Sequence, residues 1–308
     1  MPLMPVPNEN IDGAIEKVVA KLLRMDPSGS KFSDAIARSY STIYNGQETG
    51  RYLWADLMKT EKTHFGTLFE MNVQRNFRFK DGKATDFDIA GHQVDAKWSQ
   101  TVGAWMLPPE VYGKLALVAT GNEALGFWSV GLIRVKSQYR AEGKNRDKKS
   151  KLNKLARDSV RWIWKDEPLP NNALLAIPPW VMTRVMSGSS GTRRTDELFR
   201  VAQLLLVSRI AVATVSQQLD AQKRVRYNGG SRSALRSEGF IILSGTYHRH
   251  LALTLGVPVP SATEYVSLRV VKSEVGVGAL IDGGWWRSAA FNEPSLSEAP
   301  RIPERGAR

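Results

Sequence analysis

The sequence predicts a mixed α/β (α+β) protein that divides into two folded parts. Its 308 residues match the length of about two domains, and 42% of them are apolar, which is enough for a sizeable core. The first part alternates helical stretches with short apolar runs, and the second begins with helices and ends with strands. We expect domains at 10–168 and 169–288, with flexible tails at 1–9 and 289–308.

Three helices are predicted before the first strands. The apolar residues from Ile11 to Leu23 recur at helical spacing, and the turn DPSGS ends that helix. A second helix is expected over 32–44. A third is expected over 62–77, where Phe69, Val73 and Phe77 follow one another every four residues and form an apolar stripe.

Strands are predicted next, followed by a return to helix. The segment 85–98 predicts a hairpin, and the apolar runs at 113–121 and 126–136 are bounded by turn residues, as buried strands often are. After a basic segment, we expect a helix over 152–164 and one more strand over 173–177. This order is that of a compact mixed α/β domain.

The second part has a different pattern. Helices are expected over 196–207 and 209–226, and a polar, glycine-containing turn then leads to a short basic helix within 228–240. Strands are expected over 240–245 and 264–271. Two helices, a turn, a basic helix and strands form the outline of a winged helix-turn-helix.

Positive charge is concentrated in two regions of a chain whose net charge is +13. Residues 134–157 hold ten Lys or Arg against two acids, and residues 181–272 hold thirteen against five, so each region carries +8. Clustered cations of this kind bind polyanions, and nucleic acid is the first candidate. Solubility is the alternative, but it does not require clustering.

Several function classes are excluded or disfavoured by composition. The chain has no cysteine, so it has neither disulfides nor cysteine-ligated zinc. Its four histidines are not spaced as a metal cluster, although HRH at 248–250 could place two imidazoles on one strand face, as a metal pair or as plain surface residues. No apolar run approaches the roughly 20 residues of a membrane span, and the N-terminus lacks a signal peptide. We expect a cytoplasmic protein with no membrane partner.

The segment Thr85–Trp98, TDFDIAGHQVDAKW, carries charge where a core would favour apolar groups. Because side chains alternate along a strand, Asp95 and Lys97 share one face, and folding the hairpin brings Asp86 near both. Two adjacent carboxylates repel each other unless a cation lies between them, and Mg²⁺ suits such oxygen ligands. A neighbouring lysine can orient water or offset charge on a phosphate.

Glu70 adds a fourth polar group from the preceding helix. Helical geometry places it about 60° from Val73 and about 20° from Phe77, on or beside the apolar stripe. An unpaired carboxylate there is costly, and a metal, a metal-bound water or Lys97 would relieve that cost. Asp-x-Lys alone is most often a solvated strand face. The added presence of Asp86 and Glu70 favours a site for phosphodiester hydrolysis.

At these positions the sequence resembles a known group of enzymes. Glu70, Asp86, Asp95 and Lys97 fit the helix–Asp–(Asp/Glu)-x-Lys pattern of the PD-(D/E)xK nuclease superfamily, with Thr85 where the superfamily name has proline. The wider context, from about residue 40 to 272, resembles the NaeI-type restriction endonucleases. The stretches that carry this resemblance are TLFEMNVQRNFRFKDG, VDAKWSQTVGAWMLPPE, GKNRDKK, KRVR and GVPVP.

The resemblance implies a type II restriction enzyme that acts as a homodimer and requires Mg²⁺. A PD-(D/E)xK core, with a mixed sheet flanked by helices, would cut a palindromic, GC-rich duplex such as GCCGGC. A CAP-like helix-turn-helix domain would bind a second DNA copy as an activating effector, and a cognate DNA methyltransferase would act in the same system. Asp86 and Asp95 would ligate the metal, Glu70 would support metal or water, and Lys97 would position the attacking water.

Basic residues of the two charged regions are the expected DNA contacts, and Arg predominates in the second, where it can bind phosphate or guanine bidentately. The expected contacts are Lys144, Arg146, Lys148, Lys149, Arg193, Arg194, Lys223, Arg224, Arg226, Arg232 and Arg236. Two alternatives stay open. One is a repair or recombination nuclease that recognises DNA structure, and the other is a DNA-binding regulator with an inert nuclease-like domain.

Overall fold

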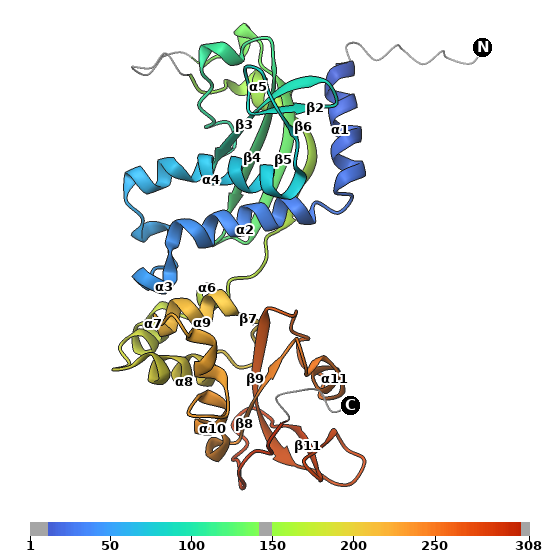
Figure 1. Cartoon of the computed structure of the whole chain (residues 1–308). Helices are drawn as coiled ribbons and strands as arrows, with labels where there is room; N and C mark the ends of the chain where they lie inside the picture. The colour runs from blue at the N-terminus through green and yellow to red at the C-terminus, as the bar shows by residue number, and fades with distance from the viewer. Residues whose placement is uncertain (1–11, 142–149, 303–308) are drawn as a thin grey trace, which may run out of the picture. The chain divides into compact units, whose positions relative to one another are not determined.

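The structure is a computed structural model that describes residues 12–141 and 150–302. The chain separates into two compact units (Figure 1). Unit 1 contains the residues up to Ile43 and those from Met58 to Pro170, and unit 2 contains 44–57 and the residues from Asn171 onward. The division near residue 170 lies close to the expected one, whereas 44–57, expected in the first domain, groups with the second. The tail expected at 1–9 lies outside the described residues.

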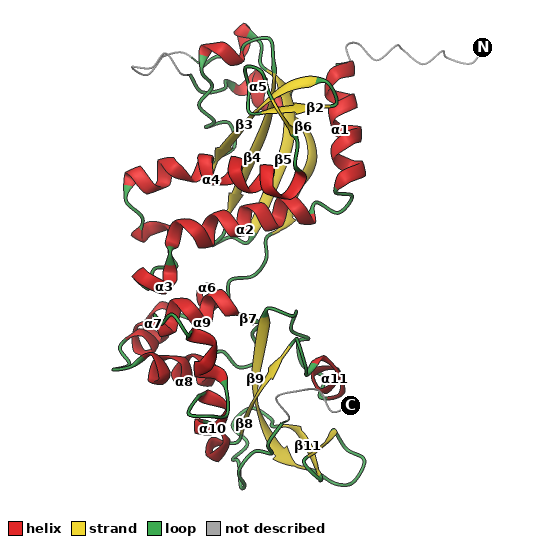
Figure 2. Ribbon diagram, in the orientation of Figure 1, coloured by secondary structure: helices red, strands yellow, loops and turns green. Residues whose placement is uncertain are grey.

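A six-stranded mixed sheet forms the centre of unit 1, with its strands in the order β1 to β6 (Figure 2). β3 and β4 are parallel, and the other neighbouring pairs are antiparallel. The strands are β1 (Lys80–Asp81), β2 (Phe87–Ile89), β3 (His92–Ser99), β4 (Leu115–Asn122), β5 (Phe127–Arg134) and β6 (Arg161–Pro168). β4 and β5 are almost wholly buried, which explains why they appear in the sequence as continuous apolar runs.

The predicted helices before the sheet are confirmed as α1 (Gly13–Met25), α2 (Ser30–Tyr44) and α4 (Lys59–Phe77). α1 begins where the Asp12 carboxylate accepts the main-chain N–H groups of Ala14 and Ile15, at 3.0 and 3.3 Å. The stripe Phe69, Val73 and Phe77 of α4 is buried. No helix within the described ranges is long and apolar enough to cross a membrane.

Aromatic packing joins α4 to β3. The Trp98 ring lies 4.7 Å from that of Phe65 and 5.5 Å from that of Phe69, measured between centroids. It is nearly perpendicular to the Tyr40 ring of α2, at a centroid distance of 6.2 Å. Full burial of a Phe side chain contributes about 1.5–3 kcal/mol. This cluster therefore fixes α4 against the apolar face of β3.

The prediction of a helix over 152–164 is wrong except near its start. α5 spans only Lys154–Asp158, and Arg161–Pro168 forms strand β6, which pairs with β5. The aromatic and β-branched residues of RWIWKDEP favour a strand, and β5 supplies its partner. The strand expected over 173–177 is also wrong, because Ala173–Ala176 forms the short helix α6, whose N-cap residue Asn172 accepts the Leu174 N–H.

Unit 2 combines a helical layer with a small sheet. Its sheet has the order β10-β11-β9-β7, and β8 also pairs with β9. Helix core residues such as Phe199 and Val212 are fully buried in one cluster, and β8 and β9 also contribute to a second. The elements are α3 (Gly46–Thr49), α7 (Pro179–Met186), α8 (Gly191–Val201), β7 (Val207–Ser208), α9 (Arg209–Ser216), α10 (Ser231–Ala234), β8 (Phe240–Ser244), α11 (Arg249–Thr254), β9 (Glu264–Lys272), β10 (Ala279–Ile281) and β11 (Gly284–Ser288).

The long helix expected over 209–226 is wrong. α9 ends at Ser216, and Gln217 adopts a left-handed conformation with φ of 52°. A 3₁₀ helix, η4 (Ala221–Val225), follows in its place. The strands expected over 240–245 and 264–271 are confirmed as β8 and β9, which are antiparallel neighbours. A helix-turn-helix needs a second helix of several turns, but each helical element between Gln217 and β8 has five residues or fewer. The winged helix-turn-helix therefore stays a prediction.

Two segments of unit 2 differ from the possibilities that the sequence suggested. The segment 248–250 is not a strand, because His250 lies in α11 and the buried His248 accepts the Ser244 N–H through its Nδ1 at 2.9 Å. The tail expected to be loose from residue 289 packs on the unit as far as it is described. Ala299 and Ile302 are fully buried, and the Ile302 N–H donates to the Tyr227 hydroxyl at 2.7 Å.

We predict that Ile302→Ala lowers the free energy of unfolding of unit 2 by about 2–5 kcal/mol, the usual cost of truncating a fully buried aliphatic side chain. Urea unfolding measures the effect. The matched control is Leu296→Ala in the same tail, because Leu296 is 92% exposed and should change stability by no more than about 0.5 kcal/mol. Equal effects of the two substitutions would contradict the docking of the tail.

Candidate active site

The β2–β3 hairpin supplies three of the predicted site residues. Its strands pair with Phe87 opposite Val94, and the turn uses Ala90 and Gly91 at φ of 54° and 80°, as a two-residue hairpin turn of right-handed twist requires. Asp88 is used in this turn, since its carboxylate accepts the Gly91 N–H at 3.0 Å. The hairpin expected from the sequence is therefore confirmed.

Asp86 lies immediately before β2, where the ladder with β3 stops. The last paired residues are Phe87 and Val94. The Ala96 N–H of β3 donates instead to Asp86 Oδ2 at 2.6 Å. This charge-assisted hydrogen bond holds the Asp86 carboxylate beside the segment that carries Asp95 and Lys97.

Asp95 and Lys97 point to the same face of β3 and form an ion pair through Asp95 Oδ2 and Lys97 Nζ. Asp95 is only 7% exposed, and burial raises the pKa of its carboxyl, with the Lys97 charge acting in the opposite direction. Lys97 Nζ also donates to the Ala96 carbonyl at 3.0 Å. The remaining described groups donate no hydrogen bond to the buried Asp95 Oδ2.

Glu70 approaches this group from α4. It follows the buried Phe69 in the helix and is itself half-buried. Burial raises the pKa of its carboxyl, the negative charge of Asp86 raises it further, and the positive charge of Lys97 lowers it. Asp95 adds to the rise. The four residues singled out in the sequence therefore lie within electrostatic range of one another.

Three carboxylates and one ammonium leave this cluster with an excess of negative charge. Carboxylate oxygens are the ligands of hard divalent cations, and the buried Asp95 Oδ2 has Lys97 as its only neighbour of opposite charge among the described residues. The donor set therefore fits a cation such as Mg²⁺. The described residues do not, however, include three acidic or imidazole groups already arranged as metal ligands, so the expected set of Asp86, Asp95 and Glu70 is not preformed.

Glu110 is an acidic neighbour to which the sequence reasoning gave no role. It lies in the 3₁₀ helix η2 (Pro109–Val111), and its charge contributes to the raised pKa of Asp95. The sequence offered a sign of its importance, because Glu110 is the last residue of VDAKWSQTVGAWMLPPE, one of the stretches that carry the family resemblance. Only the fold shows that the 14 residues between Asp95 and Glu110 return the chain to the site.

The predicted DNA contacts fall into three groups. Lys144, Arg146, Lys148 and Lys149 lie outside the described residues. Arg193, Lys223 and Arg226 are exposed on unit 2. The other four make contacts within unit 2.

Arginines of this third group stabilise unit 2 from within. Arg194 donates to the carbonyls of Gly188, Val215 and Ser216 at 2.7–3.1 Å, which joins α8 to the end of α9. Arg224 pairs with Asp220 at 2.9 Å. The remaining two also donate to main-chain carbonyls; they are Arg232, to Ile242, and Arg236, to Ala299.

Comparison with known proteins places this arrangement in context. The family described as restriction endonuclease NaeI matches residues 16–296 of the chain. The type II restriction enzyme NaeI of Lentzea aerocolonigenes is 40% identical over 315 residues, a match that covers 99% of each chain. The matched region spans both units and contains all four positions of the acidic cluster.

The mixed sheet flanked by helices, with the acidic cluster and lysine beside it, together with these matches, defines a type II site-specific deoxyribonuclease. The chain belongs to the NaeI restriction endonuclease family. As a restriction enzyme, it binds DNA and hydrolyses its phosphodiester bonds.

The raised pKa of Glu70 gives a prediction for the metal-free protein. A carboxyl whose pKa is higher in the folded state than in the unfolded state stabilises the fold at acidic pH. This stabilisation is lost as the pH rises from the pKa of the unfolded state through that of the folded state. Glu70→Gln should therefore raise the thermal unfolding midpoint at neutral pH, and the gain should vanish towards pH 4. The control is Asp158→Asn, which removes an exposed carboxylate of unit 1. A gain that is independent of pH would contradict the prediction.

Proposed function

We propose that unit 1 hydrolyses phosphodiester bonds of duplex DNA in a Mg²⁺-dependent reaction at the cluster of Glu70, Asp86, Asp95 and Lys97. The observation that carries this proposal is the electrostatic coupling of three carboxylates and one lysine beside the open end of the β2–β3 ladder. Structural ion pairs normally balance their charges. A cluster with excess negative charge is instead suited to a cation and to an anionic substrate that the cation can neutralise.

Asp86 and Asp95 would hold the metal ion, and Glu70 would support the ion or one of its waters. When bound, Mg²⁺ lowers the pKa of a water and offsets negative charge on the phosphate. Asp86 is fixed for this role by the Ala96 N–H, which occupies its Oδ2. Asp95 Oδ2 is engaged by Lys97, so a cation and Lys97 compete for the same oxygen.

Lys97 would act on the substrate side of the site. Its Nζ is held beside Asp95 by an ion pair and a carbonyl hydrogen bond, and it is only partly exposed. An ammonium in this position can donate to a phosphate oxygen or orient the attacking water. If Lys97 leaves Asp95 when the substrate arrives, its charge moves from a carboxylate to the phosphate.

The proposal includes the expected form of the DNA target. The enzyme would cut a palindromic, GC-rich duplex as a homodimer, because a two-fold symmetric site matches two identical active sites. A cognate DNA methyltransferase would protect the same site in the host. Family membership and the sequence resemblance support these features.

Unit 2 would bind a second copy of the DNA site and thereby activate cleavage. The exposed side chains of Arg193, Lys223 and Arg226 are the proposed contacts of this unit. The basic residues of segment 144–149, which belongs to unit 1, are instead the proposed contacts with the cleaved DNA. Contacts of exposed Lys and Arg with phosphate give affinity that falls as salt rises. Arg194, Arg224 and Arg236 are assigned to the fold of unit 2 instead.

Cleavage of supercoiled and linear plasmid with Mg²⁺ tests the proposed reaction. We predict that Asp95→Asn and Lys97→Met each reduce the cleavage rate by about 100-fold or more, the usual effect of removing one charged group that stabilises a transition state. Asp158→Asn, which removes an exposed carboxylate of the same unit, should cut at the wild-type rate. Cleavage by Asp95→Asn at that rate would contradict the assignment.

The same assay separates the alternative functions. Discrete fragments from linear duplex support site-specific restriction, and sequencing their ends identifies the site. Cleavage confined to junctions, mismatches or flaps would instead indicate a repair or recombination nuclease. DNA binding by the wild-type protein without any cleavage would indicate a regulator with an inert nuclease domain.

Competition between Lys97 and the cation gives a prediction that is independent of cleavage. Lys97→Met removes a positive charge beside three carboxylates and frees Asp95 Oδ2, so it should increase the affinity for Mg²⁺. Calorimetric titration with MgCl₂ at neutral pH measures this. Lys154→Met is the control, since its exposed ammonium pairs with Asp158, away from the cluster. Unchanged or weaker Mg²⁺ binding by Lys97→Met would mean that Lys97 does not compete.

A further inference from the structure

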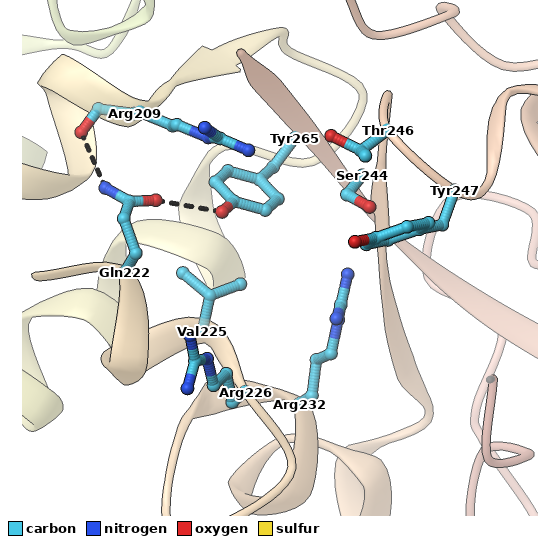
Figure 3. A pocket seen from close by; sticks show the side chains of 9 residues that line it. All are labelled: Arg209, Gln222, Val225, Arg226, Arg232, Ser244, Thr246, Tyr247 and Tyr265. Atoms are coloured by element: carbon cyan, nitrogen blue, oxygen red, sulfur yellow. Dashed lines mark hydrogen bonds between the residues drawn. The ribbon is translucent and has the colours of Figure 1, made fainter. Parts of the chain in front are cut away.

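Unit 2 contains a cavity of about 460 Å³ that the proposed nuclease reaction does not use (Figure 3). It lies among α9, η4, α10 and the ends of β8 and β9. All of its walls belong to one compact unit. The lining residues are Arg209, Gln222, Val225, Arg226, Arg232, Ser244, Thr246, Tyr247 and Tyr265.

The cavity is positively charged. Three arginines line it, and none of the nine described lining residues is Asp or Glu. In Figure 3, Arg209 and Arg232 extend into it from opposite sides, whereas Arg226 lies at its edge. Arg232 is 7% exposed, and its Nε hydrogen bond goes to a neutral carbonyl, that of Ile242. A cavity lined by arginines and, among the described residues, by no carboxylate favours an anionic ligand.

These arginines differ from others in the same unit. Arg184, Arg200 and Arg287 all form ion pairs with glutamates. Arg209 and Arg226, by contrast, form no ion pair with any residue in the described ranges. At this cavity, therefore, the charges of Arg209 and Arg226 are not neutralised by an ion pair with any described residue.

One wall of the cavity is preorganised. The Tyr265 hydroxyl donates to Gln222 Oε1 at 2.8 Å, and Gln222 Nε2 donates to the Arg209 carbonyl at 3.1 Å. These bonds connect β9, η4 and the start of α9, so the position of Arg209 is fixed by the fold. Ser244 is fixed too, because its N–H donates to the buried His248.

The volume of the cavity and its aromatic lining indicate a ligand larger than a phosphate ion. A cavity of this volume is in the range that holds a small organic ligand. Tyr247 is 50% exposed, and Figure 3 shows its ring at the cavity beside Arg232. Aromatic rings with nearby arginines form the usual surface for stacking an unpaired base. A nucleotide supplies both the anion and the ring.

We propose that this cavity binds a single nucleotide, with Arg209 and Arg232 holding its phosphate and Tyr247 stacking on its base. The nucleotide comes either from the DNA bound by unit 2, as an unstacked residue, or from solution. The first source rests on the proposed DNA-binding role of unit 2, whereas the second does not. In both cases the recognised chemistry is a phosphate ester with an attached base.

Calorimetric titration of the full chain with thymidine 5′-monophosphate, and separately with inorganic phosphate, tests the proposal. Arg209→Gln should weaken binding of both ligands about tenfold or more, because it removes a charge-assisted contact while the exposed side chain leaves folding intact. Tyr247→Ala should weaken binding of the nucleotide but not of phosphate. Lys272→Gln removes an exposed charge elsewhere in unit 2 and should change neither.

Repeating the nucleotide titration with saturating target duplex distinguishes the two sources. Loss of nucleotide binding means that the DNA supplies the occupant, and retained binding means that free nucleotide does. No nucleotide binding at millimolar concentration, or equal affinity in Arg209→Gln and wild type, overturns the proposal. Cleavage of plasmid by the same preparation reports on the nuclease function separately, so either conclusion can fail without the other.

Discussion

The constraint on which the site depends is the point where the β2–β3 ladder stops. After the pair of Phe87 and Val94, β3 continues without β2, and the N–H of Ala96 needs another acceptor. Asp86 supplies it at 2.6 Å. Leaving a buried N–H unsatisfied costs about 1–3 kcal/mol, so the hydrogen bond that completes the sheet also places the first carboxylate of the site.

The rest of the cluster follows from alternation along β3. Trp98 on one face packs on Phe65 and Phe69 and fixes α4, while Asp95 and Lys97 on the other face form the charged site. α4 in turn brings Glu70 into electrostatic range. The apolar core thus stabilises a cluster of like charges that would otherwise separate, which is how a protein maintains raised carboxyl pKa values.

The two units carry clusters of opposite charge. Unit 1 carries the acidic cluster, which in the proposed function would bind a phosphate through a cation and Lys97. Unit 2 offers arginines, some of which stabilise its fold through main-chain carbonyls and some of which line a cavity without a carboxylate. In the proposed function, binding and hydrolysis would therefore be separated chemically, since phosphate binding by arginine does not require a metal.

The sequence by itself determined the hairpin, the α4 stripe and the identity of the four clustered residues, because period-two and period-3.6 patterns are local properties of the chain. Tertiary structure decided the rest. Residues 161–168 became a strand because β5 offered a partner, and Ala299 and Ile302 at the end of the described tail are buried because unit 2 offers them an apolar surface. Only folding brings Glu110 near Asp95 and Arg209 to the cavity of unit 2. Such contacts join residues far apart in sequence, where no periodicity records them.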